Sequence, residues 1–127
     1  MKVISVPISV GELIDKVTIL RIKQKKIDAP EKLAHINHEL KSLLEVCESG
    51  QIDLGLEDVS KLEQVNLELW QIEDDIREKE RAKAFDQEFI ELARAVYVTN
   101  DQRFALKDAL NRHFGSEYFE TKSYKPY

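Results

Sequence analysis

Polar side chains that could carry chemistry recur at helical spacing in two stretches of the sequence. The first stretch consists of Asn66, Trp70, Glu73, Arg77 and Glu80, and the second of Asn100, Arg103, Lys107 and Asn111. Steps of three and four residues place side chains on one face of a helix. The second stretch also continues the line of Ala93 and Val96, where a helical bundle normally has apolar residues.

The two polar stretches allow two interpretations. If their helices pack antiparallel, Glu73 and Arg77 can meet Asn100 and Arg103 in charge-assisted hydrogen bonds that fix the helix register. Alternatively, Arg, Lys and Asn side chains beside a Trp can bind a small carboxylate or phosphate. We prefer the architectural interpretation. The candidate ligand-binding residues are Trp70, Glu73, Arg77, Asn100, Arg103 and Lys107.

No metal or cofactor site is predicted. His35 and His38 lie three residues apart, but a di-iron bundle needs Glu-x-x-His on two helices, and the third and fourth predicted helices have no His before His113. The acidic run 73–75 spreads its carboxylates around a helical turn. Cys47 lies in an apolar seam without the partners that a nucleophile needs. The four glycines are isolated, so no phosphate-binding loop is present.

Composition favours one soluble domain over residues 1–127. The chain is 43% hydrophobic and 34% charged, with a formal net charge of −5, a field that opposes binding to nucleic acid. A single cysteine points to a reducing compartment, and no apolar stretch is long enough to span a membrane. We therefore expect a cytoplasmic protein with neither nucleic-acid nor membrane partners.

Apolar side chains at steps of three and four predict four helices. The first begins after Ser9, which has the spacing of a capping box with Glu12, and extends to about Ile27. The second begins at about Pro30, since proline fits a first helical turn, and Asp28 is its expected cap.

The second pair of predicted helices is longer. The third begins at about Glu57 and continues for about 27 residues, or about 40 Å. Asp86 is the expected cap of the fourth, with Phe85 and Ile90 as a hydrophobic staple, and Gly115 ends it.

The predicted fold class is all-α: an elongated antiparallel bundle of four helices, two shorter and two long, with short extended N- and C-terminal segments. The segment 3–8 alternates apolar and polar residues, and the tail 117–127 is rich in aromatic residues. One hypothesis pairs these two segments as a two-stranded ribbon.

Several segments carry a resemblance to a known family. The segments 10–16 (VGELIDK) and 69–77 (LWQIEDDIR), with parts of 92–103, 115–117 and 122–124, resemble an uncharacterised family of small bacterial helical proteins, a domain of unknown function. The resemblance covers almost the whole chain. It implies a complete unit from a bacterium or a bacterial virus, and it carries no activity, substrate or catalytic residue.

A thinner similarity connects the chain to the all-helical chorismate mutases. Their first helix carries an Ile-Asp pair and a basic residue, as Ile14, Asp15 and Arg21 do here. Those enzymes hold a dicarboxylate with basic residues from several helices of a dimer. The similarity implies electrostatic binding of such a substrate by Arg21, Arg77, Arg103 and Lys107.

The leading functional hypothesis is a non-enzymatic helical protein. It would form a homodimer, or bind a protein partner, through long helices that pair as in a coiled coil. Narrow apolar seams in the first two helices motivate this hypothesis, as does Leu67, which lies off the main apolar stripe of the third. The alternative is a small anionic ligand-binding or catalytic bundle, similar to chorismate mutase, that uses the polar stripe.

Overall fold

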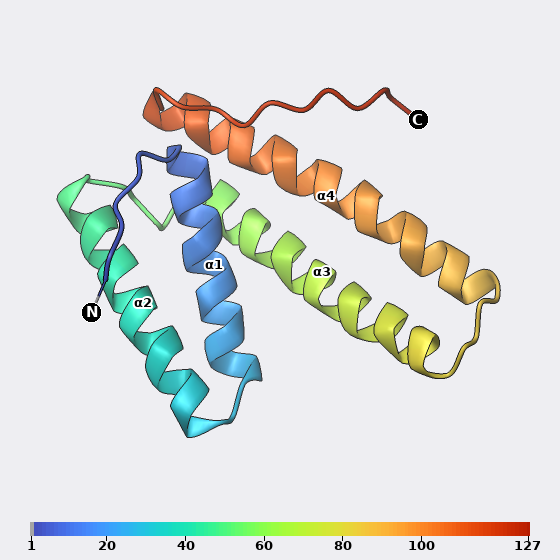
Figure 1. Ribbon diagram of the computed structural model, residues 1–127. Coiled ribbons are helices and arrows are strands. Elements are labelled where there is room, and N and C mark those ends of the chain that lie inside the picture. Colours follow the sequence, from blue (N-terminus) through green and yellow to red (C-terminus); the bar gives the residue numbers. More distant parts are fainter. Residues whose placement is uncertain (1) are drawn as a thin grey trace.

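The computed structural model describes residues 2–127 as an all-α fold (Figure 1). It contains four helices, two shorter and two long, and no strand within the described residues, which confirms the predicted fold class. The helices are α1 (Val10–Lys26), α2 (Pro30–Ser49), α3 (Glu57–Arg81) and α4 (Gln87–Phe114).

The four helices form two antiparallel hairpins joined through α1. Helix α1 packs against α2 on one side and against α3 and α4 on the other, whereas the only helix that α2 contacts in the described chain is α1. The two hairpins diverge from the region where α1 meets α3 and α4 (Figure 1). Helix α1 is therefore the central element of the fold.

The hydrophobic core lies on both sides of α1. Between α1 and α2, the buried residues are Leu13, Val17, Leu20, Ile36, Leu40 and Cys47. Between α1 and the α3–α4 hairpin, they are Ile14, Val59, Leu62 and Leu110. Polar residues on the two packed sides of α1 are removed from water, so they must find partners inside the protein.

The helix ends follow the sequence signals in most places. The Ser9 hydroxyl accepts a hydrogen bond from the Glu12 amide (3.1 Å), and the Asp86 carboxylate accepts one from the Phe89 amide (3.0 Å). Gly115 adopts the left-handed conformation (φ 64°) that favours glycine. The prediction for Asp28 was wrong, because Ala29 is the N-cap of α2 and makes no side-chain capping bond.

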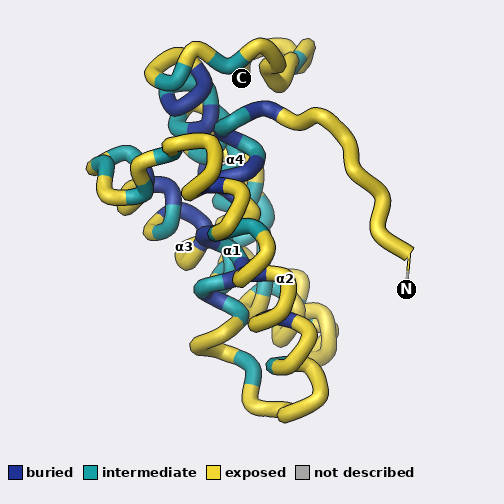
Figure 2. The backbone as a smooth tube through the Cα atoms, turned by 90° about the vertical axis from the view of Figure 1, so that its left-hand side faces the viewer, coloured by how far each residue is buried: buried dark blue, intermediate teal, exposed yellow. Residues whose placement is uncertain are grey.

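The ribbon hypothesis for the two terminal segments was also wrong. The N-terminal segment projects away from the helices, while the C-terminal tail follows α4 (Figures 1 and 2). The tail is held there by its own contacts: the Tyr127 hydroxyl donates to Asp101 (2.6 Å), and the Lys122 ammonium lies 5.0 Å from the centre of the Phe104 ring. The two segments therefore run in different directions and form no strand within the described residues.

The two halves of the α3–α4 hairpin differ in burial. In the half nearest α1, which we call the base, the buried residues are Val59, Leu62, Val65, Asn66, Thr99, Lys107, Leu110 and Asn111. The other half, which we call the arm, comprises residues 67–81 of α3 and 87–98 of α4 and has no buried residue. The difference arises because α1 packs against the base and does not extend along the arm.

Candidate functional site

A line of small and polar residues on α1 faces the α3–α4 hairpin. Gly11, Asp15, Thr18 and Ile22 follow at steps of four, three and four, and all four are buried. This spacing places them on one side of the helix, next to the apolar line that packs against α2. Asp15 was not among the residues predicted for the site. Its regular spacing with Gly11 and Thr18 was the available signal.

The centre of the site is an ion pair between α1 and α4. Asp15, which is only 1% exposed, binds the Arg103 guanidinium through both carboxylate oxygens, with 2.9 Å between Oδ1 and Nε. This hydrogen bonding raises the pKa of Arg103 above its usual value. The Asn66 amide donates to Asp15 (2.8 Å) and to the Thr18 hydroxyl (2.9 Å). Three helices are thus joined by one satisfied buried cluster.

A second polar connection joins the start of α1 to the end of α4. The Lys107 ammonium, on a side chain only 5% exposed, lies 2.7 Å from the Glu12 carboxylate and 3.4 Å from that of Glu120. The Gly11 amide donates to the Asn111 side chain (2.6 Å). Glu12 therefore pairs with Lys107, so only the Ser9 half of the expected capping box forms.

Gly11 allows the two helices to approach this closely. A Cβ atom at this position would lie 2.5 Å from the Lys107 carbonyl oxygen and 2.9 Å from the Asn111 side chain. Any other residue would separate the helices or move the backbone of α4.

An open cleft of about 550 Å³ lies beside the buried cluster. Its lining consists of Ile19 from α1, Asn66, Leu69, Trp70, Glu73, Asp74 and Arg77 from α3, and Asn100 and Arg103 from α4. Five of the six candidate residues therefore line one cleft. Lys107 does not line it, because its ammonium is turned toward Glu12 and Glu120.

The expected network across α3 and α4 has different partners in the structure. Glu73 pairs with Arg77 along α3 (3.2 Å), and Arg103 pairs with Asp15 of α1. Asp74 has no ion-pair partner within residues 2–127. The cations that line the cleft are thus neutralised by carboxylates of the chain itself.

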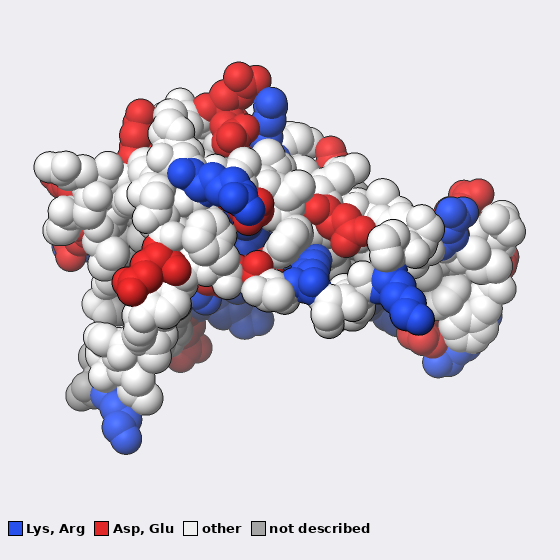
Figure 3. Space-filling view, turned by 90° about the horizontal axis from the view of Figure 1, so that it is seen from above, with Lys and Arg blue, Asp and Glu red and all other residues white. Residues whose placement is uncertain are grey.

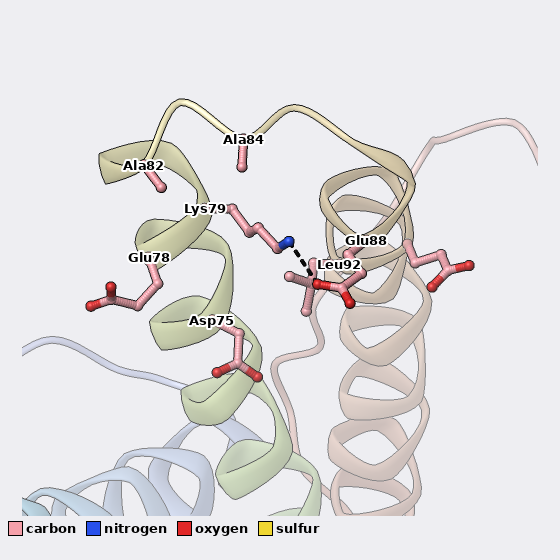
Figure 4. A pocket seen from close by; sticks show the side chains of 8 residues that line it. Asp75, Glu78, Lys79, Ala82, Ala84, Glu88 and Leu92 are labelled. Atoms are coloured by element: carbon pink, nitrogen blue, oxygen red, sulfur yellow. Dashed lines mark ion pairs between the residues drawn. The ribbon is translucent and has the colours of Figure 1, made fainter.

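A second cleft, of about 650 Å³, lies at the tip of the arm (Figure 4). Lys79 reaches across it from α3 and lies 3.0 Å from the Asp86 carboxylate and 2.6 Å from that of Glu88. The hydrogen bond with Glu88, and then that with Asp86, raises the pKa of Lys79, and Lys79 lowers the pKa of Asp86. We call this group of three residues the tip clasp. It connects the end of α3 to the start of α4.

The rest of the described surface has no obvious site for a metal or a polyanion. No group of three or more His, Cys, Asp or Glu residues within residues 2–127 could hold a metal ion. On the face shown in Figure 3, acidic and basic side chains are interspersed and form no patch of one sign. None of the four described helices has a span apolar and long enough to cross a bilayer.

Comparison with known proteins gives a family but no activity. No curated protein and no solved structure matches the chain. A protein-family model does match, over residues 2–126, and therefore covers nearly the whole sequence. The chain belongs to this family, which is described as a family of unknown function (DUF6165).

Proposed function

We propose that the protein acts by self-association, with two copies pairing through the side of the arm that continues the cleft. This surface, which we call the open face, consists of Trp70, Glu73 and Arg77 on α3 and Ala93 and Val96 on α4. Trp70, Glu73 and Arg77 line the cleft. Ala93 and Val96 continue the line of the cleft residues on α4 toward the tip, at helical spacing.

The observation that carries the proposal is the contrast between base and arm. In the base, α1 covers the line of α3 and α4 that includes Asn66 and Arg103. Along the arm, no described helix covers the continuation of that line, and Trp70 and Val96 remain half-buried. Two helices alone bury little apolar surface, and each square ångström removed from water contributes about 25 cal/mol. A helix from a second copy would supply the missing cover.

We expect the two copies to form a symmetric dimer that leaves no open face for a third copy. Most homodimers have a twofold axis, so that every contact between the two copies forms twice. The open face contains both signs of charge, Glu73 and Arg77, beside an aromatic ring and small apolar side chains. Such a mixture is typical of interfaces that form between folded proteins.

We further propose that this association takes place in the cytoplasm of a bacterial cell. The lone cysteine, Cys47, is buried between α1 and α2, and desolvation raises the pKa of its thiol. A thiol of this kind stays reduced and unreactive in a reducing compartment.

The alternative, an anion-binding or catalytic cleft, has less support from the geometry. Arg103 is bound by Asp15, Lys107 by Glu12 and Glu120, and Arg77 by Glu73. Arg21, which the chorismate-mutase similarity would place in such a site, does not line the cleft. An incoming carboxylate would have to displace an existing internal partner, so we do not favour this function.

Sedimentation velocity over a concentration series tests the proposal. Trp70 is the only tryptophan, so its fluorescence reports directly on the open face. We expect a dimer at high concentration and a blue shift of the emission as Trp70 becomes buried. A chain that stays monomeric up to about 1 mM, where an association of about 4 kcal/mol would be detected, contradicts the proposal.

A pair of matched variants locates the interface. Val96→Glu places a charge on the open face and should leave only monomer, with unchanged helical circular dichroism. Val46→Glu makes the same change on α2, where Val46 is 53% exposed, and should dimerise like the wild type. Equal dimerisation of the two variants would exclude the open face.

A further inference from the structure

The C-terminal end of α1 has an excess of unpaired positive charge. Arg21, Lys23, Lys25 and Lys26 lie within the last six residues of the helix. Within residues 2–127, none of these four side chains forms an ion pair with a carboxylate. All four are half-buried or exposed. The favourable effect of the helix dipole accounts for a preference for cations here, but not for the absence of acidic partners.

This basic end continues the side of α1 that faces the cleft. Lys23 follows four residues after Ile19, which lines the cleft, and Lys26 follows four residues after Ile22, the last buried residue of α1. Residues four apart lie on the same face of a helix. Beyond Ile22, α1 has diverged from its own α3–α4 hairpin (Figure 1), so this face has no cover within the chain.

The arm has the opposite charge. Residues 67–98 contain nine carboxylates and five cations. Four of the cations, namely Arg77, Lys79, Arg81 and Lys83, already form ion pairs with carboxylates of the arm itself. Asp74, which lines the cleft near Trp70, is left without a cation within the described chain. The arm therefore presents an acidic edge next to the open face.

From this complementarity we infer which part of the second copy covers the open face. The inference rests on the proposed self-association: the basic end of α1 of one copy lies along the arm of the other. Lys23 and Lys26 then face Asp74, which has no cation within the described chain, and its neighbour Glu73, which already pairs with Arg77. A twofold axis forms the same contact twice, because each copy carries one basic end and one acidic arm. Opposite charges at the rim of an interface speed association and fix its register, and salt weakens them.

Charge reversal with rescue tests this inference. Glu73→Lys with Asp74→Lys places cations opposite the basic end, and we expect at least about a tenfold loss of dimer affinity. Lys23→Glu with Lys26→Glu should produce a similar loss. The variant with all four changes again has opposite charges facing one another across the interface, with their signs exchanged. It should therefore regain most of the wild-type affinity. Glu39→Lys with Glu45→Lys makes the same charge change on exposed sites of α2 and should leave the affinity unchanged.

The outcomes separate this inference from the proposed function. If Val96→Glu abolishes dimers while reversal at Glu73 and Asp74 does not, the open face pairs with a different segment and this inference is overturned. A four-site variant as weak as either double variant overturns it as well. If the wild-type chain forms no dimer at any concentration, the proposed function itself fails.

Discussion

The base and the arm are two halves of the same pair of helices, yet they are stabilised in different ways. In the base, α1 adds a third helix and buries both leucines and polar groups, among them Leu62, Leu110 and Asn66. In the arm, the same two helices face each other without a third and bury no residue. A continuous helix is therefore not uniformly stable along its length, because packing against a third helix supplies most of the stability.

The largest expected effect comes from breaking the ion pair in the base. Arg103→Ala leaves the Asp15 carboxylate buried without its cation, and we expect a loss of about 3–5 kcal/mol in the free energy of unfolding. Arg77→Ala removes a guanidinium from an exposed pair in the arm and should cost less than about 0.5 kcal/mol in the monomer. Urea denaturation at low protein concentration measures both. Similar losses would show that base and arm do not differ.

The next effect concerns apolar packing. Leu62→Ala creates a cavity in the base, where Leu62 is fully buried, and should cost about 2–5 kcal/mol. Ile76→Ala in the arm removes a half-buried side chain, so the monomer should lose much less stability. Thermal unfolding of the two variants under dilute conditions makes the comparison. A loss at Ile76 as large as that at Leu62 would mean that the arm has a core of its own.

A smaller effect is expected where α1 touches α4. Gly11→Ala forces a methyl group against the Lys107 carbonyl, and we expect a loss of about 1–3 kcal/mol from overpacking. Gly50→Ala, whose added Cβ would lie 3.3 Å from the Val46 carbonyl oxygen, is the control away from the base and should cost less. An equal loss of stability at the two glycines would show that the close approach of α1 and α4 at Gly11 does not specifically stabilise the base.

The smallest effect is expected at the tip clasp of the arm. Lys79 lowers the pKa of Asp86, so the clasp stabilises the folded state above the ordinary pKa of an aspartate, 3.8, and this contribution is lost as the pH falls through the lower folded value. Amide hydrogen exchange should therefore quicken at residues 79–89 below about pH 4 before it does in the base. The Phe89 amide also lowers the pKa of Asp86, so Lys79→Gln should weaken this pH dependence without abolishing it, and an unchanged pH dependence would exclude the clasp as a cause.

The four helices were predicted from apolar residues at steps of three and four, from capping residues and from glycines. Each of these signals acts within a few residues of the chain, so the sequence alone reveals it. Ser9 and Asp86 cap their helices as predicted, and Gly115 adopts the left-handed backbone conformation that favours glycine at a helix end. Asp28 does not cap α2, since Pro30 begins that helix and Ala29 occupies the capping position. Asp28 lies one residue before the capping position, and the spacing of apolar residues does not determine the start of a helix to within one residue.

The site was predicted less completely than the fold. The polar stripe predicted that Glu73 and Arg77 would meet Asn100 and Arg103. These residues line one cleft, because two long antiparallel helices place their polar lines side by side, but they form no ion pair between α3 and α4 within the described residues. The stripe predicted no contact beyond these two helices. It missed Asp15, the partner of Arg103, because that contact depends on how α1 crosses the hairpin. The angle at which α1 crosses the hairpin depends on the packing of all three helices. The spacing of residues within one helix therefore cannot predict it.

The connections between α1 and α4 also determine the order in which the chain can fold. Asp15 and Arg103 are 88 residues apart, and Gly11 and Asn111 are 100 apart. At a synthesis rate of about 5–20 residues per second, α4 is completed several seconds after α1. Until α4 emerges, α1 can pack only against α2 and α3, so Asp15 can accept a hydrogen bond from Asn66 but lacks its cation, Arg103. We expect the α1–α2 and α3–α4 hairpins to form early as local units, and the long-range docking of one onto the other to be the slow step of folding.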